Sequence, residues 1–181
     1  MGLLLKRALD QAAVWHRTQL RKYPIVEVPY MSHVAGVAAT LARHAFDEEV
    51  VAAGALHDVI EDCGVTAEEL ATSFGERVSS LVVHCSETDR SLAWEERKAR
   101  YVDGFVHKPW EAQAITLADK IDNFESIIVC REHHGDPWAM FRRGRDAQLS
   151  RFEMLAKKVR DLPTHPLIDA YAAALEQVSR I

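Results

Sequence analysis

The sequence predicts a single all-α domain. Apolar residues recur at helical spacing along most of the chain, beginning with the segment at residues 3–21. No segment shows the sustained alternation of apolar and polar residues that is typical of a half-buried strand. The 181 residues suit one domain, and a chain of this length can bury a sizeable core without disulfides or a structural metal. We therefore expect one helical domain over residues 1–181.

The N-terminal half of the chain is divided by clear helix signals. After the first predicted helix, two prolines and several β-branched residues predict a short extended loop at residues 23–29. A second helix is expected at residues 33–45, with Ser32 as its N-cap. A third helix is expected at residues 48–62, because Gly64 supplies the residue that often follows a helix end.

The rest of the chain continues the helical pattern. Thr66 and Glu69 form the Thr-x-x-Glu pattern of a capping box, which predicts a helix that starts there and is interrupted at Gly75. A turn is expected at residues 133–136. The remaining helices are expected at residues 76–85, 94–106, 111–128, 152–160 and 167–181.

Composition and charge exclude several classes of function. The net charge of −5 and the isoelectric point near 6.0 argue against a nucleic-acid polymer as partner. No apolar stretch approaches the ~20 residues that span a bilayer, and Lys6 and Arg7 follow the N-terminus too soon for a signal peptide. Cys63, Cys85 and Cys130 are odd in number and far apart, as expected in a reducing compartment. We expect a soluble cytoplasmic protein with no membrane partner, whose oligomeric state the sequence does not indicate.

Four ionisable residues lie within six positions of the third predicted helix, which is otherwise apolar. They are His57, Asp58, Glu61 and Asp62. On a continuous helix these side chains share an arc of about 140°, because each residue advances by about 100°. A solvated helix face would normally include Lys or Arg, and this segment has neither. The cluster could hold a cation and still have carboxylates left to move protons.

A complete metal shell needs residues from other helices. His33 begins a helix with an apolar face, and Asp119 interrupts a second strongly apolar helix. Taken alone, each is more often a structural histidine or a surface acid, so the conjunction with His57 and Asp58 carries the prediction. A mixed histidine and aspartate shell favours Mn, Fe, Zn or Co over Cu(I).

The pattern His33, His57-Asp58 and Asp119 resembles that of the HD-domain metal-dependent phosphohydrolases. Within that superfamily, residues 16–123 are similar to the hydrolase domain of RelA/SpoT-type alarmone enzymes, in stand-alone form. The other motifs that carry this resemblance are Arg21-Lys22, Pro29-Tyr30, Val37-Ala38, Glu61-Asp62, Phe74-Gly75-x-x-Val78, Arg97-Lys98 and Leu117-Ala118-Asp119-Lys120-x-x-Asn123. The resemblance implies an all-α HD-domain helical bundle.

The resemblance also implies a set of functional residues. One divalent metal, Mn2+ foremost and Fe, Zn, Co or Mg otherwise, would be held by His33, His57, Asp58 and Asp119. Glu61 and Asp62 would orient and deprotonate the attacking water. Substrate-binding residues would be Arg21, Lys22 and Asn123, with Arg97 and Lys98 as weaker candidates.

The implied reaction is hydrolysis of the 3′-pyrophosphate of guanosine alarmones, ppGpp or pppGpp, to GDP or GTP and pyrophosphate. Two alternatives stay open: an HD-domain phosphohydrolase for another nucleotide or phosphorylated small molecule, and a catalytically silent nucleotide-sensing module. The long loop at residues 23–28 and Thr18, where this group usually has glycine, put guanine selectivity in doubt. Asp122 stands where the family more often has His or an aromatic residue, and we expect this extra acid to repel phosphate unless a cation offsets it.

Overall fold

The computed structural model describes residues 2–86 and 93–181, except for the side chains of Trp94 and Lys98. The described residues form helices and loops without a named strand, as predicted. Only an isolated antiparallel bridge between Leu20 and Pro29 interrupts the helical character of this part of the chain. No described helix is both long and apolar enough to cross a membrane.

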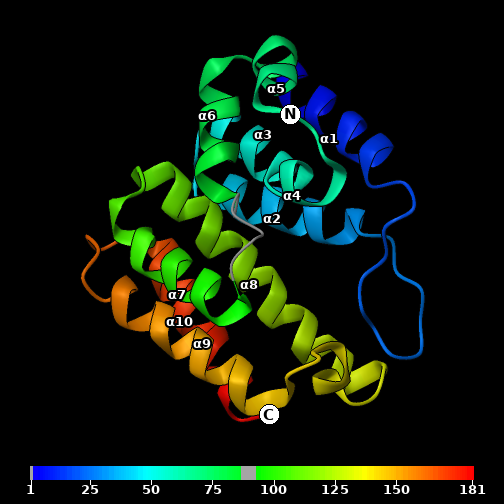
Figure 1. The fold of residues 1–181 in the computed structure, drawn as a ribbon, viewed down its shortest axis with the longest axis vertical. Helices are drawn as coiled ribbons and strands as arrows, with labels where there is room; N and C mark the ends of the chain where they lie inside the picture. Colours follow the sequence, from blue (N-terminus) through cyan, green and yellow to red (C-terminus); the bar gives the residue numbers. More distant parts are fainter. Residues whose placement is uncertain (1, 87–92) are drawn as a thin grey trace.

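Figure 1 shows the order and arrangement of the helices. The α-helices are α1 Leu3–Trp15, α2 Met31–Arg43, α3 Glu48–Leu56, α4 Val59–Cys63, α5 Ala67–Phe74, α6 Glu76–Cys85, α7 Trp94–Gly104, α8 Trp110–His133, α9 Gly144–Val159 and α10 Pro166–Ser179. Two short 3-10 helices, η1 Phe105–His107 and η2 Pro137–Met140, follow α7 and α8.

Helix α8 runs through the middle of the molecule (Figure 1). It packs against α2, α3 and α6 and also against α10, so it joins the N-terminal and C-terminal helices. Its apolar residues Ile115, Leu117 and Phe124 are fully buried and belong to the same core cluster as Leu41 of α2 and Leu56 of α3. Burying each such side chain contributes roughly 1.5–3 kcal/mol. The polar residues of α8 that face this core are therefore held in fixed positions.

The first helix ends earlier than predicted, at Trp15 instead of residue 21. The following residues use their backbone groups in a different way. The N–H of Arg21 donates to the carbonyl of Val28 at 2.8 Å, and the N–H of Tyr30 donates to the carbonyl of Gln19 at 2.9 Å. These bonds bring together the two ends of the loop that was predicted from the prolines at residues 24 and 29.

The N-cap predicted for the second helix was wrong. Helix α2 begins at Met31, with Tyr30 as its N-cap residue and no side-chain capping bond. The N–H of Ser32 donates to the carbonyl of Pro29 at 3.0 Å, so Ser32 already lies inside the first turn. Tyr30 adopts helical dihedral angles, φ −58° and ψ −23°, which extends the helix backwards.

The predicted third helix is interrupted at its functional residues. Helix α3 ends at Leu56 and α4 begins at Val59, with Asp58 at φ −99° and ψ −4°. The ring Nδ1 of His57 bonds to the carbonyl of Gly54 at 2.8 Å, one turn back in α3. The single continuous helix expected over residues 48–62 was therefore wrong, because the backbone turns at His57 and Asp58. The N–H of Asp62 still donates to the carbonyl of Asp58 at 2.8 Å, so Asp62 lies one helical turn after Asp58, as expected.

Several predicted helix ends are confirmed. Gly64 follows α4 in the left-handed conformation at φ 72°, which glycine adopts without a Cβ penalty. Both bonds of the capping box between Thr66 and Glu69 are present. The limits of α6 match the prediction, whereas α7 ends at Gly104, before η1, and α8 extends to His133. Helix α9 begins at Gly144, well before the predicted residue 152, because its weak periodicity hid the first turns.

Candidate metal centre and adjoining pocket

Two histidines and one aspartate meet where α2 and α3 cross. The Nε2 atoms of His33 and His57 lie 3.3 Å apart, and the two residues are 1 % and 5 % exposed. The Oδ2 atom of Asp58 lies 3.0 Å from Nε2 of His57 and 3.6 Å from Nε2 of His33. One possible ligand atom from each of these three residues lies within 4.8 Å of the other two, so together they could hold a metal ion.

Helix α8 brings a further carboxylate to the same place. The Oδ1 atom of Asp119 lies 3.5 Å from Nε2 of His33 and 3.9 Å from Nε2 of His57. The other oxygen of this carboxylate pairs with the ammonium group of Lys120, and the side-chain amide of Asn123 donates to Oδ1. The structure therefore brings together the four residues that the sequence predicted as ligands, from three different helical segments.

Hydrogen bonds orient both imidazole rings toward this centre. The carbonyl of Gly54 can only accept, so Nδ1 of His57 carries a hydrogen and Nε2 is the nitrogen that can bind a metal once its own proton is displaced. Nδ1 of His33 lies 2.5 Å from Oδ2 of Asp122 and donates to it. Such bonds to the second ring nitrogen fix the tautomer of a metal-binding histidine.

Asp122 has a different place from the one expected. It is buried, and it bonds to His33 and lies 3.7 Å from the guanidinium of Arg21. The sequence predicted that this acid would repel phosphate unless a cation offset its charge, and Arg21 is such a cation. Its spacing of three residues from Asp119 is the signal that could have placed both acids on one helix face.

Burial and charge shift the protonation of these groups in opposite directions. Burial disfavours the imidazolium of His57, but the carboxylates of Asp58 and Asp119 raise its pKa to about 9. Burial likewise opposes ionisation of Asp58, yet the two histidines hold its pKa well below the usual value. The pKa of Asp119 is also lowered despite burial, first by Lys120 and then by His57. Protons on the histidines thus balance the carboxylates, which is the task that a divalent cation can take over.

The donor set suits a divalent metal. Imidazole nitrogens and carboxylate oxygens together favour borderline or hard first-row metals. Both Nε2 atoms face the carboxylates of Asp58 and Asp119 instead of solvent. The residues at this site therefore fit a single divalent ion, which side chains from α2, from the turn between α3 and α4, and from α8 would hold.

Tyr30 adds a contact that the sequence did not assign. Its hydroxyl donates to Oδ2 of Asp58, and its ring lies 5.1 Å from the ring of His33 and 4.9 Å from that of His16. Burial, followed by the charge of Asp58, raises the pKa of the Tyr30 hydroxyl, so it stays a donor. Tyr30 therefore fixes the orientation of the Asp58 carboxylate.

A cavity of about 310 Å³ adjoins this centre. The loop after α1 forms one wall, and residues of α8 and η2 form the other. Its lining residues are Gln19, Leu20, Arg21, Lys22, Tyr30, Asp62, Asn123, Ser126, Met140 and Phe141. The three residues that the sequence predicted foremost for substrate binding are among them, together with one of the two predicted catalytic carboxylates. Gln19, Ser126, Met140 and Phe141 were not predicted, since each lies outside a recognisable charge pattern.

Arg21 is held against α8 at the floor of this pocket. Its Nη2 donates to Oγ of Ser126 at 2.7 Å and to Oδ1 of Asn123 at 3.1 Å. Asn123 in turn donates to Asp119, so polar contacts connect the pocket to the candidate metal centre. Arg21 thus presents a fixed positive charge a short distance from the centre.

The remaining predicted residues are less closely placed. Glu61 is half-buried on α4 beside Asp62, and the described lining of the 310 Å³ cavity does not include it. Arg97 is half-buried on α7, and the described lining of the 310 Å³ cavity does not include it. The side chain of Lys98 lies outside the described residues.

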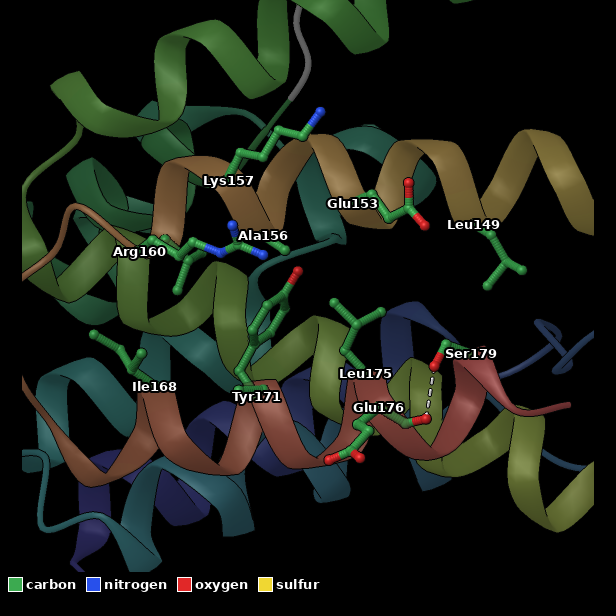
Figure 2. A pocket seen from close by; sticks show the side chains of 12 residues that line it. Leu149, Glu153, Ala156, Lys157, Arg160, Ile168, Tyr171, Leu175, Glu176 and Ser179 are labelled. Atoms are coloured by element: carbon green, nitrogen blue, oxygen red, sulfur yellow. Dashed lines mark hydrogen bonds between the residues drawn. The ribbon is translucent and has the colours of Figure 1, made fainter.

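A second cavity, of about 470 Å³, lies between α9 and α10 (Figure 2). Leu149 and Leu175 contribute apolar surface, and the Tyr171 ring points from α10 toward α9, where its hydroxyl donates to the carbonyl of Phe152 at 3.4 Å. None of the predicted site residues lines it. The larger volume alone does not make it a site, because it lacks a convergent set of polar groups like that around Asp58.

The sequence matches the HD domain family over residues 8–139. The chain belongs to the HD-domain family. This HD-domain protein is also 39 % identical over 123 residues to a guanosine-3′,5′-bis(diphosphate) 3′-pyrophosphohydrolase, MESH1, of Drosophila melanogaster, with 67 % of this chain and 68 % of the relative covered. The MESH1 of Homo sapiens is 38 % identical over 128 residues, with 70 % of each chain covered.

Solved structures agree with this assignment. The HD-domain chain superposes on a metazoan orthologue of SpoT, described as hydrolysing ppGpp, with a TM-score of 0.82 and 29 % identity, covering 99 % of this chain and 96 % of the other. It also matches lmo0812 of Listeria monocytogenes with a TM-score of 0.73 and 33 % identity, covering 87 % and 100 %. The all-α HD-domain fold and the hydrolase class predicted from the sequence are confirmed.

Proposed function

We propose that this HD-domain hydrolase removes the 3′-pyrophosphate of guanosine-3′,5′-bis(diphosphate) and its 5′-triphosphate analogue. The products are GDP or GTP and pyrophosphate. The observation that carries the proposal is that the cluster of His33, His57, Asp58 and Asp119 adjoins a pocket that holds Arg21 and Asn123, and that Asn123 bonds to Asp119. The named activity of the MESH1 relatives supports the same substrate.

In this proposal His33, His57, Asp58 and Asp119 hold one divalent ion, Mn2+ foremost. The ion supplies Lewis-acid chemistry, which polarises a phosphoryl oxygen and acidifies water. Tyr30 and Asp122 keep the ligand side chains in orientation through their bonds to Asp58 and His33. Their hydrogen bonds are formed before substrate arrives, so little reorganisation is needed during the reaction.

Glu61 and Asp62 manage the proton of the attacking water. Asp62 lines the pocket and is exposed to it, which gives its carboxylate access to a water near the scissile phosphorus. A carboxylate within hydrogen-bond reach of that water accepts its proton as the oxygen attacks. The bond from phosphorus to the ribose 3′ oxygen breaks, the carboxylate passes the proton on to that oxygen, and GDP or GTP and pyrophosphate are released.

Arg21, Lys22 and Asn123 bind the substrate. The two cations neutralise phosphate charge, and Asn123 offers its amide to base or ribose. Arg97 and Lys98 remain weaker candidates for contact with the pyrophosphate. We also propose that the protein acts in the cytoplasm, which the unpaired state of Cys63, Cys85 and Cys130 supports.

The test is product analysis by chromatography after incubation of the Mn2+-loaded protein with ppGpp, with other nucleotides and with phosphomonoesters. The variant His57→Ala is the control. Release of GDP and pyrophosphate by the wild type alone supports the proposal. If another phosphate compound is hydrolysed and ppGpp is not, the proposal is wrong and that compound represents the substrate class.

A second candidate function is hydrolysis of another phosphorylated small molecule. The long loop at residues 23–28 favours this candidate. Its first residue, Tyr23, follows the pocket residue Lys22 and packs on His134, with ring centroids 5.1 Å apart. A third candidate, a silent nucleotide-sensing module, would be supported by tight ppGpp binding without product.

A further inference from the structure

We propose that His16 and Gln19 form a hydrogen-bonded chain that positions the carboxylate of Asp62 at the pocket. The chain runs from a buried imidazole, through a half-buried amide, to an exposed carboxylate. The inference rests on the proposed function, which gives Asp62 a role in proton transfer. It adds two positioning residues that lie outside the candidate metal centre.

The chemistry of the partners determines the direction of each hydrogen bond. Nε2 of Gln19 lies 2.7 Å from Oδ2 of Asp62, and Oε1 of Gln19 lies 2.6 Å from Nδ1 of His16. An ionised carboxylate only accepts, so the amide nitrogen must face Asp62. The amide oxygen then faces His16, whose Nδ1 must carry the hydrogen. The amide nitrogen thus donates to Asp62 and the amide oxygen accepts from His16, whereas a reversed amide would point its oxygen at the Asp62 carboxylate and lose that bond.

Packing and backbone hydrogen bonds hold the His16 end of this hydrogen-bonded chain in place. His16 is 2 % exposed and its ring packs on Tyr30, with centroids 4.9 Å apart. The backbone N–H of Gln19 donates to the carbonyl of His16 at 2.9 Å, and the carbonyl of Gln19 accepts from the N–H of Tyr30 at 2.9 Å. Main-chain and side-chain bonds therefore both hold Gln19 in place.

Asp62 needs this support because it is exposed. An exposed side chain exchanges between rotamers, and holding it in one of them costs conformational entropy. The bond from Gln19 occupies one oxygen of the carboxylate and leaves the other for a water in the pocket. A proton acceptor must lie within about 2.6–3.2 Å of the proton donor, so an unrestrained Asp62 would be less effective.

His16 also contacts Tyr30, which bonds to the predicted metal ligand Asp58. The experiment must therefore separate an effect of His16 on Asp62 from an effect on metal binding. Tyr30 packs on His16 and donates to Asp58, so loss of the His16 ring could disturb a predicted metal ligand. Two substitutions divide these roles. His16→Phe keeps an aromatic ring against Tyr30 and loses the donor. His16→Asn loses the ring and keeps a donor, because its Nδ2 lies near the position of the imidazole Nδ1.

The experiment measures kcat and KM for ppGpp, Mn2+ affinity by calorimetry, and Tm. We expect Gln19→Met and His16→Phe to lower kcat roughly 10- to 100-fold, the loss that a small misplacement of a reacting group produces. Their KM and Mn2+ affinity should stay near the wild-type values. His16→Asn should restore most of the kcat that His16→Phe loses.

A double-mutant cycle gives the decisive comparison. If Gln19 acts through Asp62, adding Gln19→Met to Asp62→Asn should cause no further loss of kcat. Full additivity of the two losses would overturn the proposal, as would a rise in KM alone in Gln19→Met or a fall in Mn2+ affinity equal to the loss of kcat. The Gln19 cycle decides the matter if His16→Phe does not fold. Full activity of Asp62→Asn would instead refute the proposed role of Asp62, and absence of ppGpp turnover in the wild type would refute the proposed function.

Discussion

Asp122 occupies the space where Gly36 would carry a side chain. A Cβ built on Gly36 would lie 1.9 Å from Oδ1 of Asp122 and 2.9 Å from its Cγ. Helix α8 can therefore bring this carboxylate directly over the backbone of α2, from which His33 projects one turn earlier. The missing side chain permits the bond of 2.5 Å between Asp122 and Nδ1 of His33.

The substitution Gly36→Ala should weaken metal binding without unfolding the protein. The new methyl group forces Asp122 to rotate away and give up its bond to His33. Loss of such a bond to a metal-binding histidine costs about 10- to 100-fold in metal affinity. Alanine is also favoured over glycine inside a helix by about 1 kcal/mol, which offsets part of the steric cost. Calorimetric titration with Mn2+, alongside Tm, measures both effects.

The matched control is Gly104→Ala. Gly104 is also helical, at the end of α7, and a Cβ there would meet no atom within 4 Å. This variant should keep the Mn2+ affinity of the wild type. Equal Mn2+ affinity in Gly36→Ala and the wild type would show that Asp122 does not orient His33 for the metal.

Metal binding should depend steeply on pH. The neighbouring carboxylates raise the pKa of His57 to about 9, above its ordinary value of 6.5, so its proton competes with the metal at neutral pH. Affinity should rise by about tenfold per pH unit between pH 7 and 9 for one displaced proton. Calorimetry in buffers of different ionisation enthalpy should detect the released proton. An affinity that is flat over this range would contradict the assignment of His57.

The metal-free protein should show the opposite trend in stability. Because the folded pKa of His57 lies above the unfolded value, its contribution is fully present below about pH 6.5 and is lost as pH rises toward 9. Tm of the chelator-treated protein should therefore fall over that range. The loss should be smaller in His57→Asn, which has no titrating ring.

The catalytic carboxylates should separate from the predicted ligands in mutagenesis. Glu61→Gln and Asp62→Asn should keep the metal and lose most of the turnover, because the amide cannot accept a proton. His57→Ala and Asp58→Ala should lose both metal and turnover. Metal content by atomic absorption and initial rates measure the difference. Undiminished turnover in either of the last two variants would contradict the ligand assignment, and loss of metal in Glu61→Gln would make Glu61 a ligand.

Arg21 should contribute to substrate affinity. The substitution Arg21→Met removes a charge-assisted contact worth about 1.5–3 kcal/mol, which corresponds to a rise in KM of roughly 10- to 100-fold. Arg17→Met makes the same change in net charge in the same segment, where Arg17 is exposed and donates to the carbonyl of Val14. This control should leave KM near the wild-type value. A similar rise in both variants would mean that general electrostatic attraction, and not the pocket, explains the effect.

The sequence by itself determined the helical fold and the chemistry of the site. Apolar periodicity, the Thr66–Glu69 capping box and Gly64 are local signals, and local interactions along the chain are enough to form the structures they predict. The order of His33, His57-Asp58 and Asp119 along the chain predicted that these residues meet at one site, and their side chains do lie together. Their role as metal ligands stays a prediction until the metal is measured.

Only the tertiary structure decided which side chains support these residues. The bond between His33 and Asp122 joins residues 89 positions apart, and the one between Gln19 and Asp62 joins residues 43 positions apart. Neither contact has a period or a motif, since each depends on how closely two segments far apart in the sequence approach. The break between α3 and α4 is similar, because the turn at His57 and Asp58 lies where side chains of α2 and α8 complete the site.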